Sequence, residues 1–434
     1  MVGRPLFLTF LNIIGRALNF ILYLVIANLY GASQSTDWFF FVYAIAYFFI
    51  GISYYATESA LVPAWHRLPE TDHPKMFRSA INLSLYVLPV IGLLLVISGF
   101  FLAPRRGISL PDSTAMALAI CLVLACQPSL AFLSSLFSSY RQSRQRYILP
   151  TVHLSLRTIG VLAVLLLAHC RTITVLAIAY LAGEVVRFLC LQHGQFQARK
   201  LFKSTASAGN FLWPVYKHVA WMTVALMCTV INPVIDLAMV GKFGGGSLTL
   251  VEYAGKLRGM PVLALGGLLV YFLGEWSYQH HQQDRKLAWQ QVNKTFLKLI
   301  VYCFPAVILL MISEKLWVPL IFFSNKFSSV DLHLLQQLLY WYFPGVVFLA
   351  GSLILSRAIL VVQQAKLMAF VTLVAAGLNV VFNLLFLKIM GLSGVALSTT
   401  MVDVFVCFTY YLVARRLLNT PHRTKSFVSR REIL

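Results

Sequence analysis

Apolar residues along this chain fall into repeated blocks, separated by polar joints or joints that contain Pro and Gly. The blocks are long enough for membrane-spanning helices, which need about 20 residues, and longer than the alternating segments of a transmembrane β-barrel. We therefore predict an all-α integral membrane protein with about twelve transmembrane helices. The predicted spans are 6–30, 38–62, 79–103, 114–138, 148–168, 172–193, 213–240, 248–275, 295–322, 333–361, 366–390 and 393–417.

Composition and charge agree with a membrane protein. Hydrophobic residues make up 59% of the chain and charged residues 11%, whereas soluble domains carry about 25% charge. The net charge of +21 does not indicate a nucleic-acid partner, because the basic residues concentrate in alternate loops. The positive-inside rule then places both termini in the cytoplasm, which requires an even number of spans. The loops on the opposite side carry only Arg105, Arg106, Arg171, Lys242, Lys326 and Lys388.

The polar connection at 194–212 divides the predicted helices six and six. It predicts a first lobe at 1–193, an inter-lobe loop at 194–212, a second lobe at 213–417 and a basic tail at 418–434. The first predicted span ends in VIANLYGASQST and the seventh in DLAMVGKFGGGS, a weak similarity. It is consistent with two parallel repeats related by an axis along the membrane normal, or with ordinary turn chemistry.

Ionisable residues within the predicted spans are informative, because each costs about 2.5–3.5 kcal/mol at the bilayer centre unless it faces a cavity or a partner. The spacing of Glu184 and Arg187 favours a local ion pair. Glu252 and Lys256 are also spaced so that a local ion pair is an alternative to a role in the cavity. Arg258 lies nearer a span end, where snorkelling would satisfy it. The residues singled out are the cations Arg16, Arg157, Arg187, Lys256 and Arg258 and the anions Glu58, Glu184, Asp236, Glu252 and Asp403, with Asp37 at the outer end of the second span.

Arg16 and Arg157 have no acidic residue within one helical turn, so each needs a partner from another helix or from a ligand. Unpaired cations in the first, fifth and eighth spans are suited to a phosphate or carboxylate cargo. The sequence has no phosphate-binding loop, nucleotide fingerprint or nucleophile elbow, so neither an enzyme nor ATP-driven transport is predicted. Transport would then depend on an ion gradient or on the membrane potential.

Three stretches carry a family resemblance. They are GRALNF, LVIANLYGASQSTDWFFFVYAI and ALVPAWHR within 15–67, VINPVIDLAMVGKFGGGSLTLVEYAGKLRGMPVLALGG at 230–267, and LNVVFNLLFLKIMGLSGVALSTT at 378–400. They resemble the MurJ (MviN) lipid II flippases of the multidrug/oligosaccharidyl-lipid/polysaccharide (MOP) exporter superfamily. The resemblance implies two six-helix lobes around a cationic cavity that opens alternately to each side of the bacterial inner membrane. It also implies a polyprenyl-diphosphate-linked saccharide as substrate.

The resemblance also implies site residues. Arg16, Asp37 and Lys256 match charged cavity positions of the family, and Arg157 joins them as an intramembrane cation. Two further family arginine positions fall near Leu22 and at Ile50–Gly51, where the charge is missing. The family's sodium site maps onto Asp236, Asn379, Asn383, Val395 and Thr399, whose oxygen atoms suit a hard cation. Asn383 stands where a second carboxylate can occur. The asparagines have an alternative role as hydrogen-bond partners between helices.

The chain departs from the MurJ pattern in length. MurJ proteins have two further C-terminal helices, whereas here the tail LLNTPHRTKSFVSRREIL follows the twelfth predicted span. Twelve spans also fit a Wzx-like flippase for O-antigen or exopolysaccharide units, or a cation-coupled multidrug antiporter. A membrane scaffold without transport is a further alternative. We predict a monomeric transporter without a cofactor other than a coupling sodium ion.

Overall fold

The structure, a computed structural model, describes residues 3–54, 61, 65, 70–111, 113–144, 146–168, 170–193, 231–263, 285–322, 326–362 and 364–419. Within these ranges every regular element is a helix. Ten of the helices are long and apolar enough to cross a membrane. The predicted all-α membrane fold is therefore confirmed.

The first lobe contains six long helical rods. Three short helical segments adjoin α4, and two of them, a π-helical turn and α5, extend it to Arg105. The α6 helix packs against α4 and α8, and α7 packs against α1 and α8. The elements are α1 (Gly3–Tyr30), α2 (Gln34–Ile52), η2 (Glu70–Asp72), α4 (His73–Ile97), η3 (Ser98–Leu102), α5 (Ala103–Arg105), α6 (Thr114–Ser143), α7 (Ile148–Leu167) and α8 (Ile173–Gln192).

The second lobe is built around α14, which packs against α11, α13 and α16. Its elements are helical residues 231–240, η4 (Gly241–Phe243), α11 (Ser247–Leu263), α13 (Arg285–Ile321), α14 (Ser329–Val361), α15 (Ala365–Met390) and α16 (Ser393–Asn419). The described parts of the seventh and eighth predicted spans are residues 231–240 and α11. The inter-lobe loop at 194–212 and residues 420–434 of the tail lie outside the described residues, so the lobe boundaries stay a prediction.

Burial separates the central helices from the lipid-facing ones. In the most apolar stretch of α14, 67% of the residues are buried, whereas in the corresponding stretch of α13 only 6% are buried. Many of the exposed side chains of α13 are large and apolar, among them Ile312 and Leu320. An exposed apolar surface of this extent is typical of a helix in contact with lipid.

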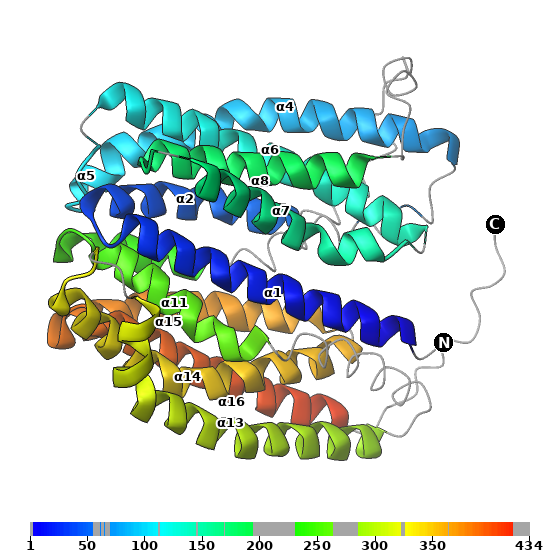
Figure 1. Ribbon diagram of the computed structural model, residues 1–434. Coiled ribbons are helices and arrows are strands. Elements are labelled where there is room, and N and C mark those ends of the chain that lie inside the picture. Colours follow the sequence, from blue (N-terminus) through cyan, green and yellow to red (C-terminus); the bar gives the residue numbers. More distant parts are fainter. Residues whose placement is uncertain are drawn as a thin grey trace.

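The two lobes lie side by side, and α11 of the second lobe contacts both α1 and α2 of the first (Figure 1). The start of α1 and the end of α16 lie at the same end of the helices (Figure 1). An even number of membrane crossings requires this arrangement. The two lobes are joined most closely at the opposite end, which we call the joined end.

Candidate functional site

Asp37, in the first turn of α2, contacts the beginning of α11 in the other lobe. Its Oδ1 atom accepts hydrogen bonds from the backbone N–H of Thr249 at 2.8 Å and from the Thr249 hydroxyl at 2.6 Å. Its Oδ2 atom accepts one from the backbone N–H of Gly246 at 2.7 Å. A carboxylate satisfies the free N–H groups at a helix N-terminus and interacts favourably with the helix dipole. A side chain of the first lobe therefore caps a helix of the second.

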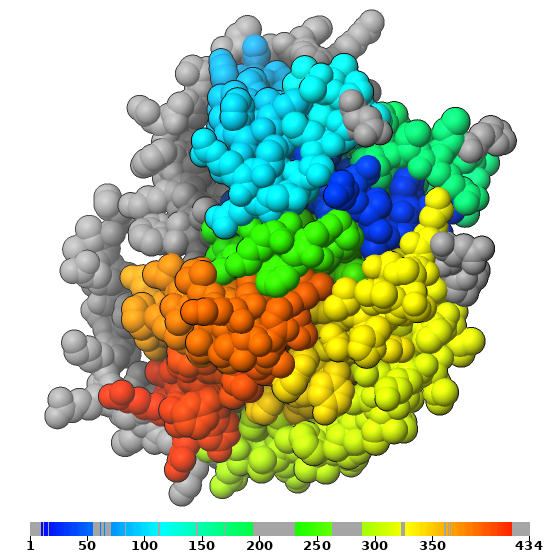
Figure 2. Space-filling view, turned by 90° about the vertical axis from the view of Figure 1, so that its left-hand side faces the viewer, coloured from blue at the N-terminus to red at the C-terminus, as the bar shows by residue number. Residues whose placement is uncertain are grey.

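Three more hydrogen bonds cross between the lobes at the joined end, one of them from the Thr249 hydroxyl to the Thr36 hydroxyl at 3.0 Å. Asn28 of α1 donates to the Ile321 carbonyl at 3.1 Å, and the Tyr253 hydroxyl of α11 donates to the Gly31 carbonyl at 3.3 Å. Gly31 has φ of +67°, and a Cβ atom there would lie 2.6 Å from the Cβ atom of Lys326. Only glycine fits this close approach. Figure 2, viewed onto this end, shows three segments packed together: the α1–α2 turn (blue), the start of α11 (green) and the start of α14 (yellow).

Lys256 lies on α11, two helical turns beyond Thr249. Its Nζ atom lies 3.1 Å from Glu252 Oε1, so the local ion pair is confirmed. The same atom lies 5.0 Å from the ring centroid of Tyr23 on α1 and 5.3 Å from that of Tyr47 on α2. Cation–π contacts stabilise such an arrangement, most strongly away from water. A cation of the second lobe is thus held between two aromatic rings of the first, with 30% of its side chain exposed.

Arg157 lies in a buried ionic cluster of the first lobe. Its Nε atom lies 2.6 Å from Oε1 of Glu184, and its guanidinium donates to the Tyr43 hydroxyl at 2.9 Å. Glu184 also pairs with Arg187 at 3.3 Å and accepts a hydrogen bond from Tyr54. The local Glu184–Arg187 pair is confirmed.

The expectation of unpaired cations in the fifth and eighth spans is wrong, because the structure shows the two alternatives, a partner from another helix for Arg157 and a local pair for Lys256. Packing of α7 against α8 brings Glu184 to Arg157, and one helical turn of α11 brings Glu252 to Lys256. Each cation therefore has a carboxylate partner before any substrate binds. Substrate binding by Arg157 and Lys256 stays a prediction, and at Lys256 an anionic group would compete with Glu252.

The backbone of Arg16 lies within α1, two helical turns before Tyr23. Its side chain lies outside the described residues, as does all of Glu58. Substrate binding by Arg16 stays a prediction. Leu22 and Ile50, where the resemblance implies further arginine positions of the family, expose 1% and 0% of their surface and pack in the hydrophobic core.

A cavity of about 450 Å³ lies inside the second lobe, among α11, residues 231–240, α14, α15 and α16. The charged residues that line it are Asp236, Glu252, Lys256, Arg258 and Asp403. Three carboxylates and two cations give a formal net charge of −1 for these side chains. Glu252 and Asp403 are paired with Lys256 and Arg258, so the remaining negative charge is that of Asp236, and this part of the cavity is suited to a cation.

Arg258 forms an ion pair with Asp403 inside this cavity, and its guanidinium lies 5.3 Å from the Tyr342 ring centroid. The expectation that Arg258 snorkels to the surface is wrong. Packing of α11 against α14 directs this position into the lobe. No local pattern in the sequence links Arg258 to Asp403, which is 145 residues away.

All five predicted sodium-site residues lie together in the second lobe. Asp236 Oδ1 accepts hydrogen bonds from the amides of Asn379 and Asn383, each at 2.7 Å. The Thr399 hydroxyl lies 3.4 Å from Asp236 Oδ2 and donates to the Val395 carbonyl at 2.9 Å. Hydrogen bonding between helices, the alternative role of the asparagines, is therefore observed. The residues also fit a hard cation, because Asn383 Oδ1 is buried without a hydrogen-bond partner among the described residues.

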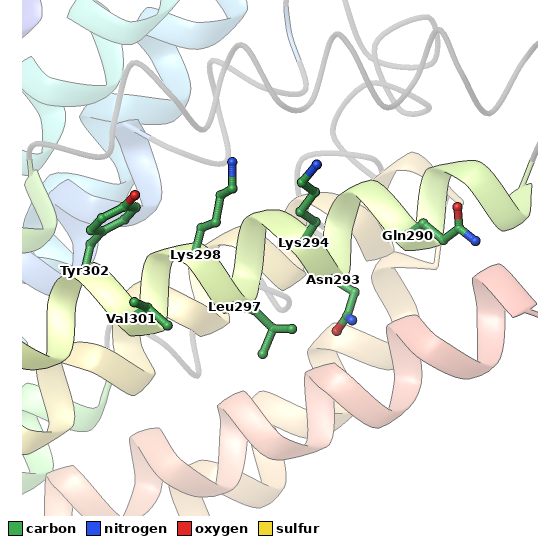
Figure 3. Close-up of a pocket in the computed structure, with 7 residues that line it drawn as sticks. All are labelled: Gln290, Asn293, Lys294, Leu297, Lys298, Val301 and Tyr302. Atoms are coloured by element: carbon green, nitrogen blue, oxygen red, sulfur yellow. The ribbon is translucent and has the colours of Figure 1, made fainter.

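A shallow groove also runs along the first half of α13. Lys294, Lys298 and Tyr302 project to one side of the helix, and Asn293 and Leu297 to the other (Figure 3). The lysines are four residues apart and form a basic stripe far from the joined end. This stripe agrees with the charge asymmetry of the loops.

Comparison with known proteins places this fold in a family. The family model described as lipid II flippase MurJ matches residues 26–433. The "probable lipid II flippase MurJ" of Thermotoga maritima is 25% identical over 383 residues, covering 87% of this chain and 78% of the relative. The protein with the same name from Buchnera aphidicola is 23% identical over 434 residues, covering 95% and 83%.

Solved structures show the same fold. A lipid II flippase MurJ in an inward closed conformation matches with a TM-score of 0.82 and 18% identity, covering 95% of this chain and 87% of that one. An inward-facing multidrug exporter of the MATE family matches with a TM-score of 0.74 and 14% identity, covering 93% and 94%. An outward-facing conformation matches with a TM-score of 0.65 and 12% identity, covering 95% of both chains. This chain belongs to the lipid II flippase MurJ family of MOP-type transporters.

Proposed function

We propose that this protein is a flippase that moves a polyprenyl-diphosphate-linked saccharide, lipid II or a close relative, from the inner to the outer leaflet of the bacterial cytoplasmic membrane. It is a transporter and not an enzyme. One observation carries the proposal: Lys256 lies between the two lobes, two helical turns away from the end at which Asp37 joins them. A cation that lies between the two lobes is suited to bind an anionic substrate that passes between them.

The joined end is the outer end in this proposal. The basic loops lie at the opposite end, and the positive-inside rule places them in the cytoplasm together with both termini. The structure then represents a state closed toward the outside. The better match to inward-facing than to outward-facing relatives supports this assignment. The transporter acts as a monomer, without a nucleic-acid partner.

Binding starts with the diphosphate in the space between the lobes. Lys256 and Arg16 provide its positive partners, and Arg fork geometry matches phosphate oxygens. The phosphate displaces Glu252 from Lys256, because one ammonium cannot fully satisfy both anions. Breaking the contacts of Asp37 with Thr249 and Gly246 then allows the outer ends to separate. This exchange of one closed end for the other is the alternating-access step.

A sodium ion bound in the second lobe couples transport to its gradient. Asp236, Asn379, Asn383, Val395 and Thr399 would hold it through carboxylate, amide, carbonyl and hydroxyl oxygens. When the side-chain amides of Asn379 and Asn383 rotate about their terminal torsions, their oxygen atoms face Asp236 in place of their N–H groups and can bind the ion. The bound ion would neutralise the Asp236 charge.

A second candidate substrate is an O-antigen or exopolysaccharide precursor on the same polyprenyl diphosphate. Leu22 and Ile50 favour it, because two arginine positions of the MurJ family are filled by buried apolar side chains here. A saccharide without peptide carboxylates would need fewer cations in the cavity. The diphosphate contact at Lys256 is common to both candidates.

Rescue of a bacterium depleted of its essential lipid II flippase tests the proposal. The full-length chain is expected to restore growth, and a variant with Lys256→Ala is expected to fail at equal membrane abundance. Rescue of O-antigen export instead, without rescue of growth, would assign the second candidate. Failure of the abundant, inserted protein in both strains would contradict the proposed function.

A further inference from the structure

A second large cavity lies on the lipid-facing side of the second lobe, close to the joined end. Its volume is about 870 Å³, and it lies between α13, α14 and the turn from α15 to α16. Glu314 is two turns before the end of α13, and His333 is one turn after the start of α14. None of its lining residues belongs to the proposed substrate or sodium sites.

Glu314 is the unusual residue of this cavity. It exposes only 6% of its surface, and its Oε2 atom is buried without a hydrogen-bond partner among the described residues. No described cation lies within ion-pair distance of it. Burying a carboxylate without a partner is costly, so a group that lines a cavity in this state calls for a cation or a hydrogen-bond donor from a ligand.

The cavity also offers groups for an anion. Lys315 follows Glu314 in the chain and is exposed. The exposed side chains of Gln337 and His333 lie across the cavity on α14, with their nitrogen atoms 3.1 Å apart. Tyr340 is 48% exposed beside them. The polar part of the cavity therefore contains groups for both a positive and a negative charge, together with an amphipathic aromatic ring.

The apolar part of the cavity lies toward the middle of α13. Ile308 and Ile312 line it and expose 41% and 74% of their surface. They precede Glu314 by about two turns and by half a turn, along the part of the helix that faces lipid. A ligand that fills the whole cavity is thus an amphiphile with its polar head at the end of the helix.

We infer that this cavity binds an aminophospholipid, a zwitterionic lipid whose headgroup carries a primary ammonium and a phosphate. The ammonium pairs with Glu314, the phosphate contacts Lys315, and an acyl chain lies along Ile308 and Ile312. A primary ammonium donates hydrogen bonds to a carboxylate, which a choline headgroup cannot do. An anionic glycerol headgroup supplies no cation for Glu314, and a free saccharide supplies neither charge. The inference needs only the membrane location and holds whatever substrate is transported.

Thermal unfolding of the purified full-length protein in detergent, with defined lipids added back, tests this inference. The lipids are phosphatidylethanolamine, phosphatidylcholine and phosphatidylglycerol with identical acyl chains. Phosphatidylethanolamine is expected to stabilise the protein most. It is expected to bind roughly tenfold more tightly than phosphatidylcholine, because its ammonium donates charge-assisted hydrogen bonds that choline cannot donate. Glu314→Gln keeps the shape of the side chain and is expected to abolish this preference.

A pair of lysine variants provides the matched control. Lys315→Gln is expected to weaken binding of phosphatidylethanolamine, whereas Lys388→Gln, in the last turn of α15 and outside the cavity lining, is expected to leave it unchanged. Native mass spectrometry of the parent protein counts bound lipids directly and decides the matter even if Glu314→Gln fails to accumulate. Equal stabilisation by the three lipids, or an unchanged preference in Glu314→Gln, overturns the inference. So does stabilisation by a soluble N-acetylglucosamine oligomer in place of the lipid.

Discussion

The carboxylate of Asp37 on α2 accepts hydrogen bonds from both the backbone N–H and the hydroxyl of Thr249 on α11. One side chain of the first lobe therefore completes the N-terminus of a helix in the second lobe. This contact is buried, and separating the lobes at that end breaks it. It is suited to a gate, because its stabilising effect is lost as a unit when the lobes move apart.

Removing this carboxylate is expected to favour the outward-open state. Asp37→Ala deletes three hydrogen bonds and is expected to weaken closure by about 2 kcal/mol, roughly 30-fold in the ratio of closed to open protein. Spin labels at Leu110 and Ser329, in a background without the seven native cysteines, report the separation of the lobes at this end. The distance distribution is expected to shift to longer values.

Thr249→Val is the matched control for that experiment. It removes the hydroxyl but keeps the backbone N–H, so closure is expected to weaken by only about 1 kcal/mol. An unchanged distance distribution in Asp37→Ala would show that Asp37 does not hold the gate.

Glu184→Gln is expected to destabilise the first lobe without direct effect on the gate. The variant leaves two buried guanidinium groups, those of Arg157 and Arg187, without the carboxylate that they share. Breaking a buried ion pair costs about 3–5 kcal/mol. Thermal unfolding of the purified protein measures the loss, and Asp331→Asn at an exposed helix start serves as the control.

Arg157→Gln separates a structural role from a role in substrate binding. If Arg157 only neutralises Glu184, the double variant Arg157→Gln/Glu184→Gln is expected to be more stable than the sum of the single effects predicts. A single Arg157→Gln variant that unfolds at the normal temperature but does not transport would instead assign the residue to the substrate.

Sodium binding is expected to strengthen when the second carboxylate is introduced. Asn383→Asp places another anionic oxygen beside Asp236, and hard cations bind more tightly as the number of charged ligands rises. The stabilisation measured in sodium relative to choline buffer is expected to grow in Asn383→Asp and to vanish in Asp236→Ala. Equal stability of the parent protein in both buffers would contradict sodium binding at this site.

Glu252→Gln tests competition at Lys256. Neutralising Glu252 frees the ammonium from an anion at 3.1 Å, so binding of a polyprenyl diphosphate is expected to tighten about fivefold. Binding is measured with a fluorescent analogue. The double variant Glu252→Gln/Lys256→Gln is expected to lack the increase in affinity. Equal affinity in the parent and in Glu252→Gln would place the diphosphate elsewhere.

The sequence predicts most of the fold, because span length and hydrophobicity are local properties. The described ends of α7, α8, α15 and α16 lie close to their predicted bounds. Local pairs one turn apart, such as Glu252 with Lys256, follow from helix geometry in the same way.

Contacts between distant helices could not be predicted in this way. Asp37 was expected at a charged cavity position, and its substrate role stays a prediction; its partner Thr249, 212 residues away on a helix of the other lobe, was not expected. Arg258 was expected at a surface and pairs with Asp403 inside the second lobe. Such pairs depend on helix packing and rotation, which no spacing within a single helix reveals. The grouping of Asp236 with Asn379 and Asn383 was predicted only through the family resemblance.

Flipping of fluorescent lipid II by the purified protein in sealed vesicles, compared with Lys256→Ala reconstituted at the same density, tests whether Lys256 binds the substrate during transport. The label that becomes accessible to a membrane-impermeant quencher measures transfer between leaflets. Transfer by the parent protein is expected, with loss of transfer in Lys256→Ala and Arg16→Ala and partial transfer in Arg16→Lys, which keeps the charge without the planar guanidinium. Undiminished transfer by correctly inserted Lys256→Ala would contradict this role of Lys256.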